Sequence, residues 1–134
     1  MNVRGVFLLC FGLHGTALMA QEKLLIDVPS GQPIFFHEVI WDQDAGQNVY
    51  RFRYIAPEIS RDGGSVNFEM AEADLKYLCE KSVLPALAGQ GRTADRIVIS
   101  ISDKKVEFGK TNAAATQYFD AFIPKDASCE WEGY

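Results

Sequence analysis

The stretch Asn48–Ala56, which reads NVYRFRYIA, has the clearest alternation of side chains in the chain. In an extended strand its three aromatic side chains would point to one side, while Arg51 and Arg53 would point to the other. This alternation is typical of an antiparallel strand with one face on a core and the other toward water. Pro57 follows and would end the strand. We therefore expect a sheet with one apolar and one polar face.

Several other segments are also rich in β-branched and aromatic residues and predict strands. The strongest is Arg96–Ser102 (RIVISIS), whose isoleucines fall on one face. The polar loop 42–47, which contains a glycine, would connect the first two strands as a hairpin. The other expected strands are Lys23–Val28, Ile34–Trp41, Val106–Phe108, Gln117–Ile123 and Cys129–Tyr134.

One helix is predicted, from about Phe68 to Leu87, with Asn67 as its N-cap. Pro85 should kink or terminate it. Apolar residues at helical spacing define its inward face: Ala71, Leu75, Leu78 and Cys79. With strands on both sides of this helix along the chain, we predict an α+β fold. It would be an antiparallel sheet of about five to seven strands with the helix on one face.

Residues 1–20 have the pattern of an export signal, so we predict a signal peptide followed by a single domain over residues 21–134. Arg4 supplies the positive start, and the apolar run Gly5–Leu13 is shorter than the roughly 20 residues that span a bilayer. Cleavage would follow Ala17 or Ala20, after general secretory export to the periplasm. The alternative is that this segment forms a buried first element of a cytosolic domain.

Removal of that leader would leave two cysteines, Cys79 and Cys129, in an oxidising compartment. We predict that they form a disulfide, which would close a loop of about 50 residues and stabilise the fold by roughly 4 kcal/mol. The alternative is two separate buried thiols.

The net charge of −5 argues against nucleic acid or an anionic lipid surface as the main partner. Arg4 is the only charged residue of the leader, so the mature domain would be one unit more acidic. No second apolar stretch is long enough to span a membrane, and no stable membrane insertion is expected after cleavage.

His37 would be the only histidine of the mature domain, which limits the possible enzymology. A small hydrolase or lyase would need it as the base, with Glu38 or Asp42 beside it. The expected strand places His37 on one face with Val39 and Trp41, and Glu38 on the other. A packed histidine is the simpler interpretation, so these residues are weak catalytic candidates.

No metal or cofactor is predicted. The Asp42-Gln43-Asp44 segment invites comparison with a calcium loop, but Gln47 and Arg53 stand where glycine and glutamate would be needed. Two cysteines in a disulfide are unable to serve as zinc ligands.

Arginine is the most promising binding feature of the sequence. Arg51 and Arg53 share a strand face and Arg61 follows closely, so together they could hold an anionic small ligand or a protein partner. The alternative is that they face water and pair with acidic residues. Trp41, and also Trp131 and Tyr134, lie near strand ends where aromatic residues serve as binding anchors.

Several stretches resemble, as a set, a small exported family of unknown function from Rhodobacter-like alphaproteobacteria. They are SGQPIFFHEVIWD, RFRYIAPEISRDGGSVNFE, the helix with LCE, RIVISISDKKVEFG and the ending CEWEGY. The resemblance implies a Gram-negative periplasmic location and provides no functional residues. Together with the residue patterns, it leads us to expect a non-catalytic binding or accessory domain that acts on a protein or envelope component.

Overall fold

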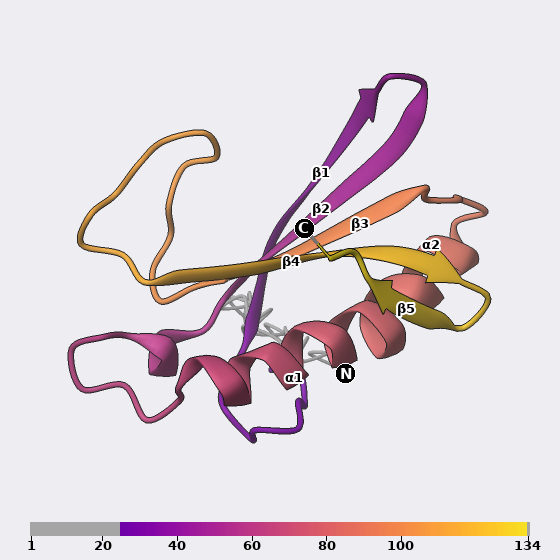
Figure 1. The fold of residues 1–134 in the computed structure, drawn as a ribbon. Coiled ribbons are helices and arrows are strands. Elements are labelled where there is room, and N and C mark those ends of the chain that lie inside the picture. Colours follow the sequence, from indigo (N-terminus) through magenta and orange to yellow (C-terminus); the bar gives the residue numbers. More distant parts are fainter. Residues whose placement is uncertain (1–24, 134) are drawn as a thin grey trace, which may run out of the picture.

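A computed structural model describes residues 25–133, and its central element is a five-stranded sheet. The strands lie side by side in chain order: β1 (Phe35–Asp44), β2 (Gln47–Ile55), β3 (Arg96–Ser102), β4 (Gln117–Lys125) and β5 (Ser128–Trp131). The main helical segment packs on one face of this sheet (Figure 1), and a short 3-10 helix, η1 (Pro57–Ile59), follows β2. The predicted α+β class is therefore confirmed, with the strand number at the lower end of the expected range.

Three of the four strand pairings are antiparallel, as expected, and the central pairing of β2 with β3 is parallel. The exception follows from connectivity, because the helix lies between these two strands in sequence. A chain that crosses over through a helix enters the next strand in the same direction. Phe52 of β2 is thus aligned with Ile99 of β3, and the apolar faces of both strands meet the same helix.

The helix begins at Phe68, where the Asn67 side chain accepts a hydrogen bond from the Met70 N–H, as predicted for an N-cap. It consists of α1 (Phe68–Leu78), a π-helical turn η2 (Cys79–Val83) and α2 (Leu84–Gly89). Pro85 does not end the helix. Proline lacks an N–H, and its ring would collide with the carbonyl four residues earlier. The wider turn just before it accommodates the proline, with the Leu84 N–H donating to the Cys79 carbonyl.

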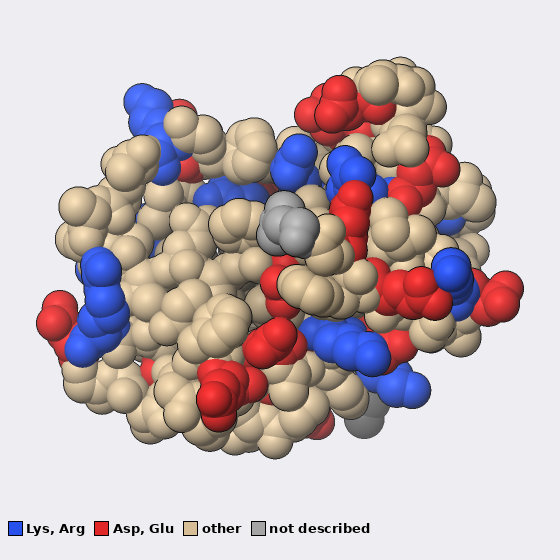
Figure 2. All heavy atoms as spheres, in the orientation of Figure 1, with Lys and Arg blue, Asp and Glu red and all other residues tan. Residues whose placement is uncertain are grey.

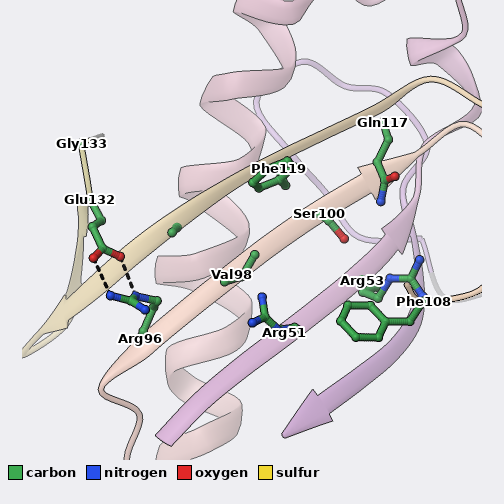
Figure 3. Close-up of a pocket in the computed structure, with 11 residues that line it drawn as sticks. Arg51, Arg53, Arg96, Val98, Ser100, Phe108, Gln117, Phe119, Glu132 and Gly133 are labelled. Carbon is green, nitrogen blue, oxygen red and sulfur yellow. Dashed lines mark hydrogen bonds and ion pairs between the residues drawn. The ribbon is translucent and has the colours of Figure 1, made fainter. Parts of the chain in front are cut away.

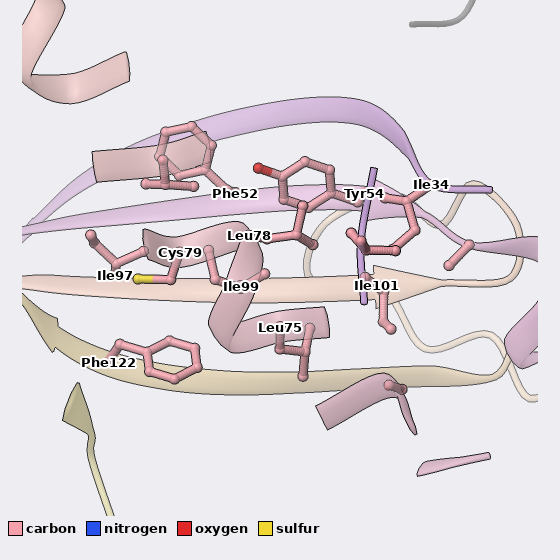
Figure 4. Packing of buried hydrophobic residues seen from close by; sticks show 14 of the residues in the cluster. Ile34, Phe52, Tyr54, Leu75, Leu78, Cys79, Ile97, Ile99, Ile101 and Phe122 are labelled. Atoms are coloured by element: carbon pink, nitrogen blue, oxygen red, sulfur yellow. The ribbon is translucent and has the colours of Figure 1, made fainter. Parts of the chain in front are cut away.

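The core lies between the helix and the apolar face of the sheet (Figure 4). The predicted inward face of the helix is confirmed, since its four residues have no exposed area. The isoleucines of β3 are equally buried, and they pack with the aromatic side chains of β2. The buried residues of this two-layer core include Ala71, Leu75, Leu78, Cys79, Ile97, Ile99, Ile101, Phe52 and Tyr54.

Cys79 and Cys129 form the predicted disulfide, with their Cα atoms 6.2 Å apart. The bond connects the π-helical turn to β5, the edge strand beside β4. Both cysteines are buried, and the Glu80 carboxylate accepts a hydrogen bond from the Cys129 N–H. The C-terminal strand is therefore fixed to the helix both covalently and by a hydrogen bond.

The first hairpin is tighter than the sequence suggested. The expected loop over residues 42–47 is wrong, because β1 continues to Asp44 and β2 starts at Gln47. Ala45 and Gly46 alone form the turn, with φ values of +49° and +80°. Two successive positive φ angles define the type I′ turn, whose twist matches that of the flanking strands. The polar residues assigned to a loop therefore extend the strands.

Residues 103–116 form a long loop rather than a strand, so the strand expected at Val106–Phe108 is wrong. The two strands after the loop exist with shifted bounds, β4 ending later and β5 starting earlier than expected. Tyr134, and the expected signal peptide with its cleavage points, lie outside the described residues. Of the expected strand Lys23–Val28, Leu25 makes one isolated bridge to Phe35.

A buried carboxylate fixes the segment that precedes β1. Asp74 of α1 has no exposed area and accepts hydrogen bonds from the Ser30 N–H at 2.9 Å and the Ser30 hydroxyl at 2.5 Å. The Gln32 amide donates a third bond of 2.6 Å to the same carboxylate. Among residues 25–133, no helix has the length and apolar character needed to cross a membrane.

Candidate functional site

The face of the sheet opposite the helix, here called the open face, carries a cavity of about 450 Å³. The strand register arranges its residues in rows across the sheet. Arg51, Val98 and Ala121 form one row, and Arg53, Ser100 and Phe119 form the next. Figure 3 shows the labelled side chains of both rows on the face of the sheet away from the helix.

The cavity exists because the central strands carry small side chains on this face. Its floor is defined here as Val98, Ser100 and Ala121, which line the cavity together with larger residues. Figure 2 shows a notch between the loop 103–116 and the tip of the β1–β2 hairpin, with basic side chains in it. A cavity of this size lies within the range of roughly 300–1,000 Å³ that small-molecule sites occupy.

Two of the arginines that line the cavity are already paired. The Arg53 guanidinium forms an ion pair with Glu38 and donates to the Val106 carbonyl at 2.7 Å. Arg96 donates two bonds of 2.6 Å each to the two carboxylate oxygens of Glu132. The pair of Arg96 with Glu132 is bidentate, and Arg53 is held by two different acceptors, so both guanidinium groups are fixed in place.

Arg51 is different, because no carboxylate among residues 25–133 pairs with it. Its Nε is buried and has no hydrogen-bond acceptor within the described part of the chain. Its guanidinium carbon lies 5.8 Å from the centre of the Phe108 ring, a cation–π contact. This contact orients the guanidinium but does not neutralise its charge.

Phe108 is supplied by the loop 103–116, which Arg61 holds in place. The Arg61 guanidinium donates to the carbonyls of Ala113 at 2.9 Å and Ala115 at 3.4 Å. Its backbone N–H donates to the Thr116 hydroxyl. Arg61 therefore lies outside the cavity. Of the three arginines singled out in the sequence, the structure brings only Arg51 and Arg53 together.

His37 and Glu38 lie at an irregularity in β1. The register shifts between Phe36 and Glu38, as in a β-bulge, and His37 is the extra residue. The expectation that His37 and Glu38 point to opposite faces is wrong, because both line a second cavity of about 400 Å³ beside the loop 103–116. The described lining of that cavity contains no serine, threonine or cysteine that His37 could activate.

Trp41 lies on the helix side of the sheet, on the opposite face from Arg51 and Arg53. Its side chain is 54% exposed, and its indole N–H donates to the Asn48 side chain at 3.3 Å. It lines a groove of about 520 Å³ together with Phe36 and Val39 of β1 and part of α2. The predicted binding residues are thus divided between the two faces.

Asp120 and Trp131 border a smaller cavity of about 300 Å³ near α1. Burial raises the pKa of the Asp120 carboxyl, and Glu72 raises it further, while a hydrogen bond from Trp131 acts in the opposite direction. Within residues 25–133 no cluster of three or more histidine, cysteine or acidic side chains is suited to hold a metal ion.

Most residues that line the cavity were not predicted from the sequence patterns. Val98 and Ser100 could have been found, because they alternate with the buried isoleucines of β3 and must lie on the other face. Phe108 gave no such signal, since it is brought to the site by a loop. Phe119 and Ala121 depend on the pairing of β4 with β3, which periodicity alone does not specify.

No curated protein and no solved structure is significantly similar to the chain. One family model does match, over residues 11–134, which include the five strands, the helix and the open face with its cavity. On this basis the chain belongs to the family of unknown function DUF6497.

Proposed function

We propose that this protein is a non-catalytic binding domain that captures an anionic ligand on the open face of its sheet. One observation carries the proposal: Arg51 presents a charge to the cavity that no described carboxylate neutralises. Leaving a charged group without a partner carries a free-energy cost. An anion bound at the guanidinium group of Arg51 would compensate this charge.

The rest of the cavity supports binding rather than catalysis. Glu132 is the carboxylate in its lining, and both of its oxygens accept bonds from Arg96. A carboxylate held in this way is a poor general base, because proton uptake would break a bidentate pair. Ser100 also lines the cavity, whereas His37 lines a different one. The open face therefore offers recognition groups without an activated nucleophile in its described part.

We further propose that the protein works in the periplasm after removal of its N-terminal leader, with an envelope component as one possible source of the anion. The apolar run Gly5–Leu13 after Arg4 supports export. The disulfide between Cys79 and Cys129 is compatible with it, because such bonds persist in oxidising compartments.

The test is to measure binding of phenylacetate, phenyl phosphate, succinate and sulfate by isothermal titration calorimetry. The variant Arg51→Gln removes the charge at the cavity, and Arg92→Gln is the matched control on an exposed residue outside it. We expect at least one anion to bind the wild type and the control, with affinity reduced about tenfold or more in Arg51→Gln. Undiminished binding by Arg51→Gln, or no binding of any anion, would contradict the proposal.

A further inference from the structure

We infer that the open-face cavity takes a monocarboxylate whose body is small, flat and apolar, with the carboxylate on Arg51. This inference rests on the proposed function and specifies the ligand class of the same site. It depends on three features of the cavity: its balance of charge, the aromatic rings at its margin and its limited volume.

The balance of charge favours a ligand with a single negative charge. Arg53 and Arg96 are neutralised by Glu38 and Glu132, so Arg51 provides the one uncompensated cation among the described lining residues. A carboxylate matches one guanidinium in both charge and geometry, because two oxygens can accept from its fork of N–H donors.

A dianion fits this site less well. Its second charge would find no unpaired cation in the described lining, and the Glu132 carboxylate lies at one end of the cavity. Like charges in a partly enclosed site repel more strongly than in water, because the local dielectric constant is lower. We therefore expect phosphate esters and dicarboxylates to bind more weakly than monocarboxylates.

The body of the ligand should be apolar and flat. Phe108 and Phe119 are 52% and 56% exposed, and both line the cavity, from the loop 103–116 and from β4. Figure 3 shows Phe108 near Arg51 and Phe119 across the floor. Exposed aromatic rings beside a cation provide apolar surface that a planar group can cover by stacking.

The floor limits the size of that body. Val98, Ser100 and Ala121 leave space above the sheet because their side chains are short, and the volume of about 450 Å³ limits what can fit there. Two sources could supply a carboxylate next to a flat apolar group: a free aromatic acid, or the C-terminus of a peptide that ends in an aromatic residue. Both share the same chemistry, and the choice of probes separates them.

The experiment compares five probes by calorimetry on the wild type. Phenylacetate is the reference. Phenylacetamide lacks the charge, acetate lacks the ring, phenyl phosphate carries additional charge, and the tripeptide Gly-Gly-Phe presents a C-terminal carboxylate. We expect phenylacetate or Gly-Gly-Phe to bind about tenfold tighter than each of the other three. The tighter of the two identifies the source of the carboxylate.

The inference is overturned if phenyl phosphate or acetate binds as tightly as the tighter of phenylacetate and Gly-Gly-Phe. In either case the proposed anion-binding function survives, provided that binding still depends on Arg51. If binding does not depend on Arg51, or no probe binds, both statements fail. The two outcomes are therefore distinguishable.

A cavity-filling variant tests the location independently. Ala121→Leu adds volume to the floor on the open face, away from the core between helix and sheet. We expect it to weaken phenylacetate binding about tenfold while its thermal unfolding stays close to that of the wild type. Full affinity in a folded Ala121→Leu protein would show that the ligand does not lie on this floor. Leu25→Ala, at an exposed position outside the cavity, is the control.

Discussion

Tyr54 carries a phenolic hydroxyl into the core, where its side chain is only 2% exposed. Burial raises the pKa of Tyr54 to about 12, because the phenolate would lose its hydration, while a hydrogen bond with Ser82 acts in the opposite direction. In the unfolded chain the same group ionises near its ordinary pKa of about 10. The folded state therefore holds this proton more tightly than the unfolded state.

This difference predicts a loss of stability at high pH. The contribution of Tyr54 is fully present below pH 10 and is lost as the pH rises from 10 to 12, because over this interval only the unfolded state gains from ionisation. We expect the free energy of unfolding to fall by about 2–3 kcal/mol over this interval from Tyr54 alone. Urea unfolding at successive pH values measures this decrease in the free energy of unfolding.

The variant Tyr54→Phe isolates this contribution from the lysines and the other tyrosines, which titrate in the same range. Its stability should change less between pH 10 and pH 12 than that of the wild type. Ultraviolet absorbance at high pH should also show one fewer late-titrating tyrosine. Equal pH dependence in the two proteins would contradict the assignment.

At the scale of elements, the β1–β2 turn combines one favourable and one unfavourable residue. Gly46 adopts a positive φ without steric cost. Ala45, at φ +49°, has a Cβ atom that comes close to the carbonyl oxygen that follows it. Asparagine tolerates this conformation better than alanine and is preferred at the first central position of a type I′ turn.

We therefore expect Ala45→Asn to raise the free energy of unfolding by about 1 kcal/mol. Ala45→Val should lower it, because a β-branched side chain is the least suited to positive φ. Chemical denaturation of both variants beside the wild type provides the measurement. A more stable Ala45→Val protein would be incompatible with the turn described above.

The elements with a strong period were predictable. The alternation in β2 and β3 and the helical spacing of Ala71, Leu75 and Leu78 each require one buried face, and the sequence pattern records that requirement directly. Three local features were not. The bulge at His37 breaks the period by one residue, the type I′ turn uses Ala45 where asparagine is usual, and a π-helical turn absorbs Pro85. Each is a backbone adjustment that periodicity does not encode.

At the scale of the whole molecule, the disulfide connects the two layers of the fold. Replacing Cys79 and Cys129 together by alanine should lower the free energy of unfolding by about 2–5 kcal/mol. The unfolded chain gains entropy when the loop between these residues is no longer closed. Denaturant unfolding of the double variant tests this expectation.

The rate at which the same cysteines react with reagents provides a second test of the buried disulfide. They are 0% and 1% exposed, so native protein treated with a reductant and an alkylating agent should react slowly, and only through unfolding. If the intact mass of the protein showed rapid alkylation in native buffer, the disulfide would not be buried as described. A sample denatured before reduction serves as the positive control.

The cavity is assembled from distant parts of the chain, and for that reason few of its residues could be predicted from the sequence. Arg51 and Arg53 share a strand, so their common face followed from alternation. The sequence did not indicate that Arg53 is paired with a carboxylate while no carboxylate in the described part of the chain pairs with Arg51. Glu38 neutralises Arg53 from β1, and the loop 103–116 brings Phe108 over both arginines. Such long-range neighbours are set by strand order and loop path rather than by any local pattern.

The parallel pairing of β2 with β3 also constrains the order in which the chain can fold. When the polypeptide emerges from its N-terminal end, the first hairpin can form early, but the inner edge of β2 stays unsatisfied until the whole helix and β3 have appeared. Throughout that interval the hairpin exposes a row of unused amide and carbonyl groups that a second nascent chain could pair with. The topology therefore creates a period during folding in which the chain is prone to aggregate. This period ends when β3 pairs with β2 at the centre of the sheet.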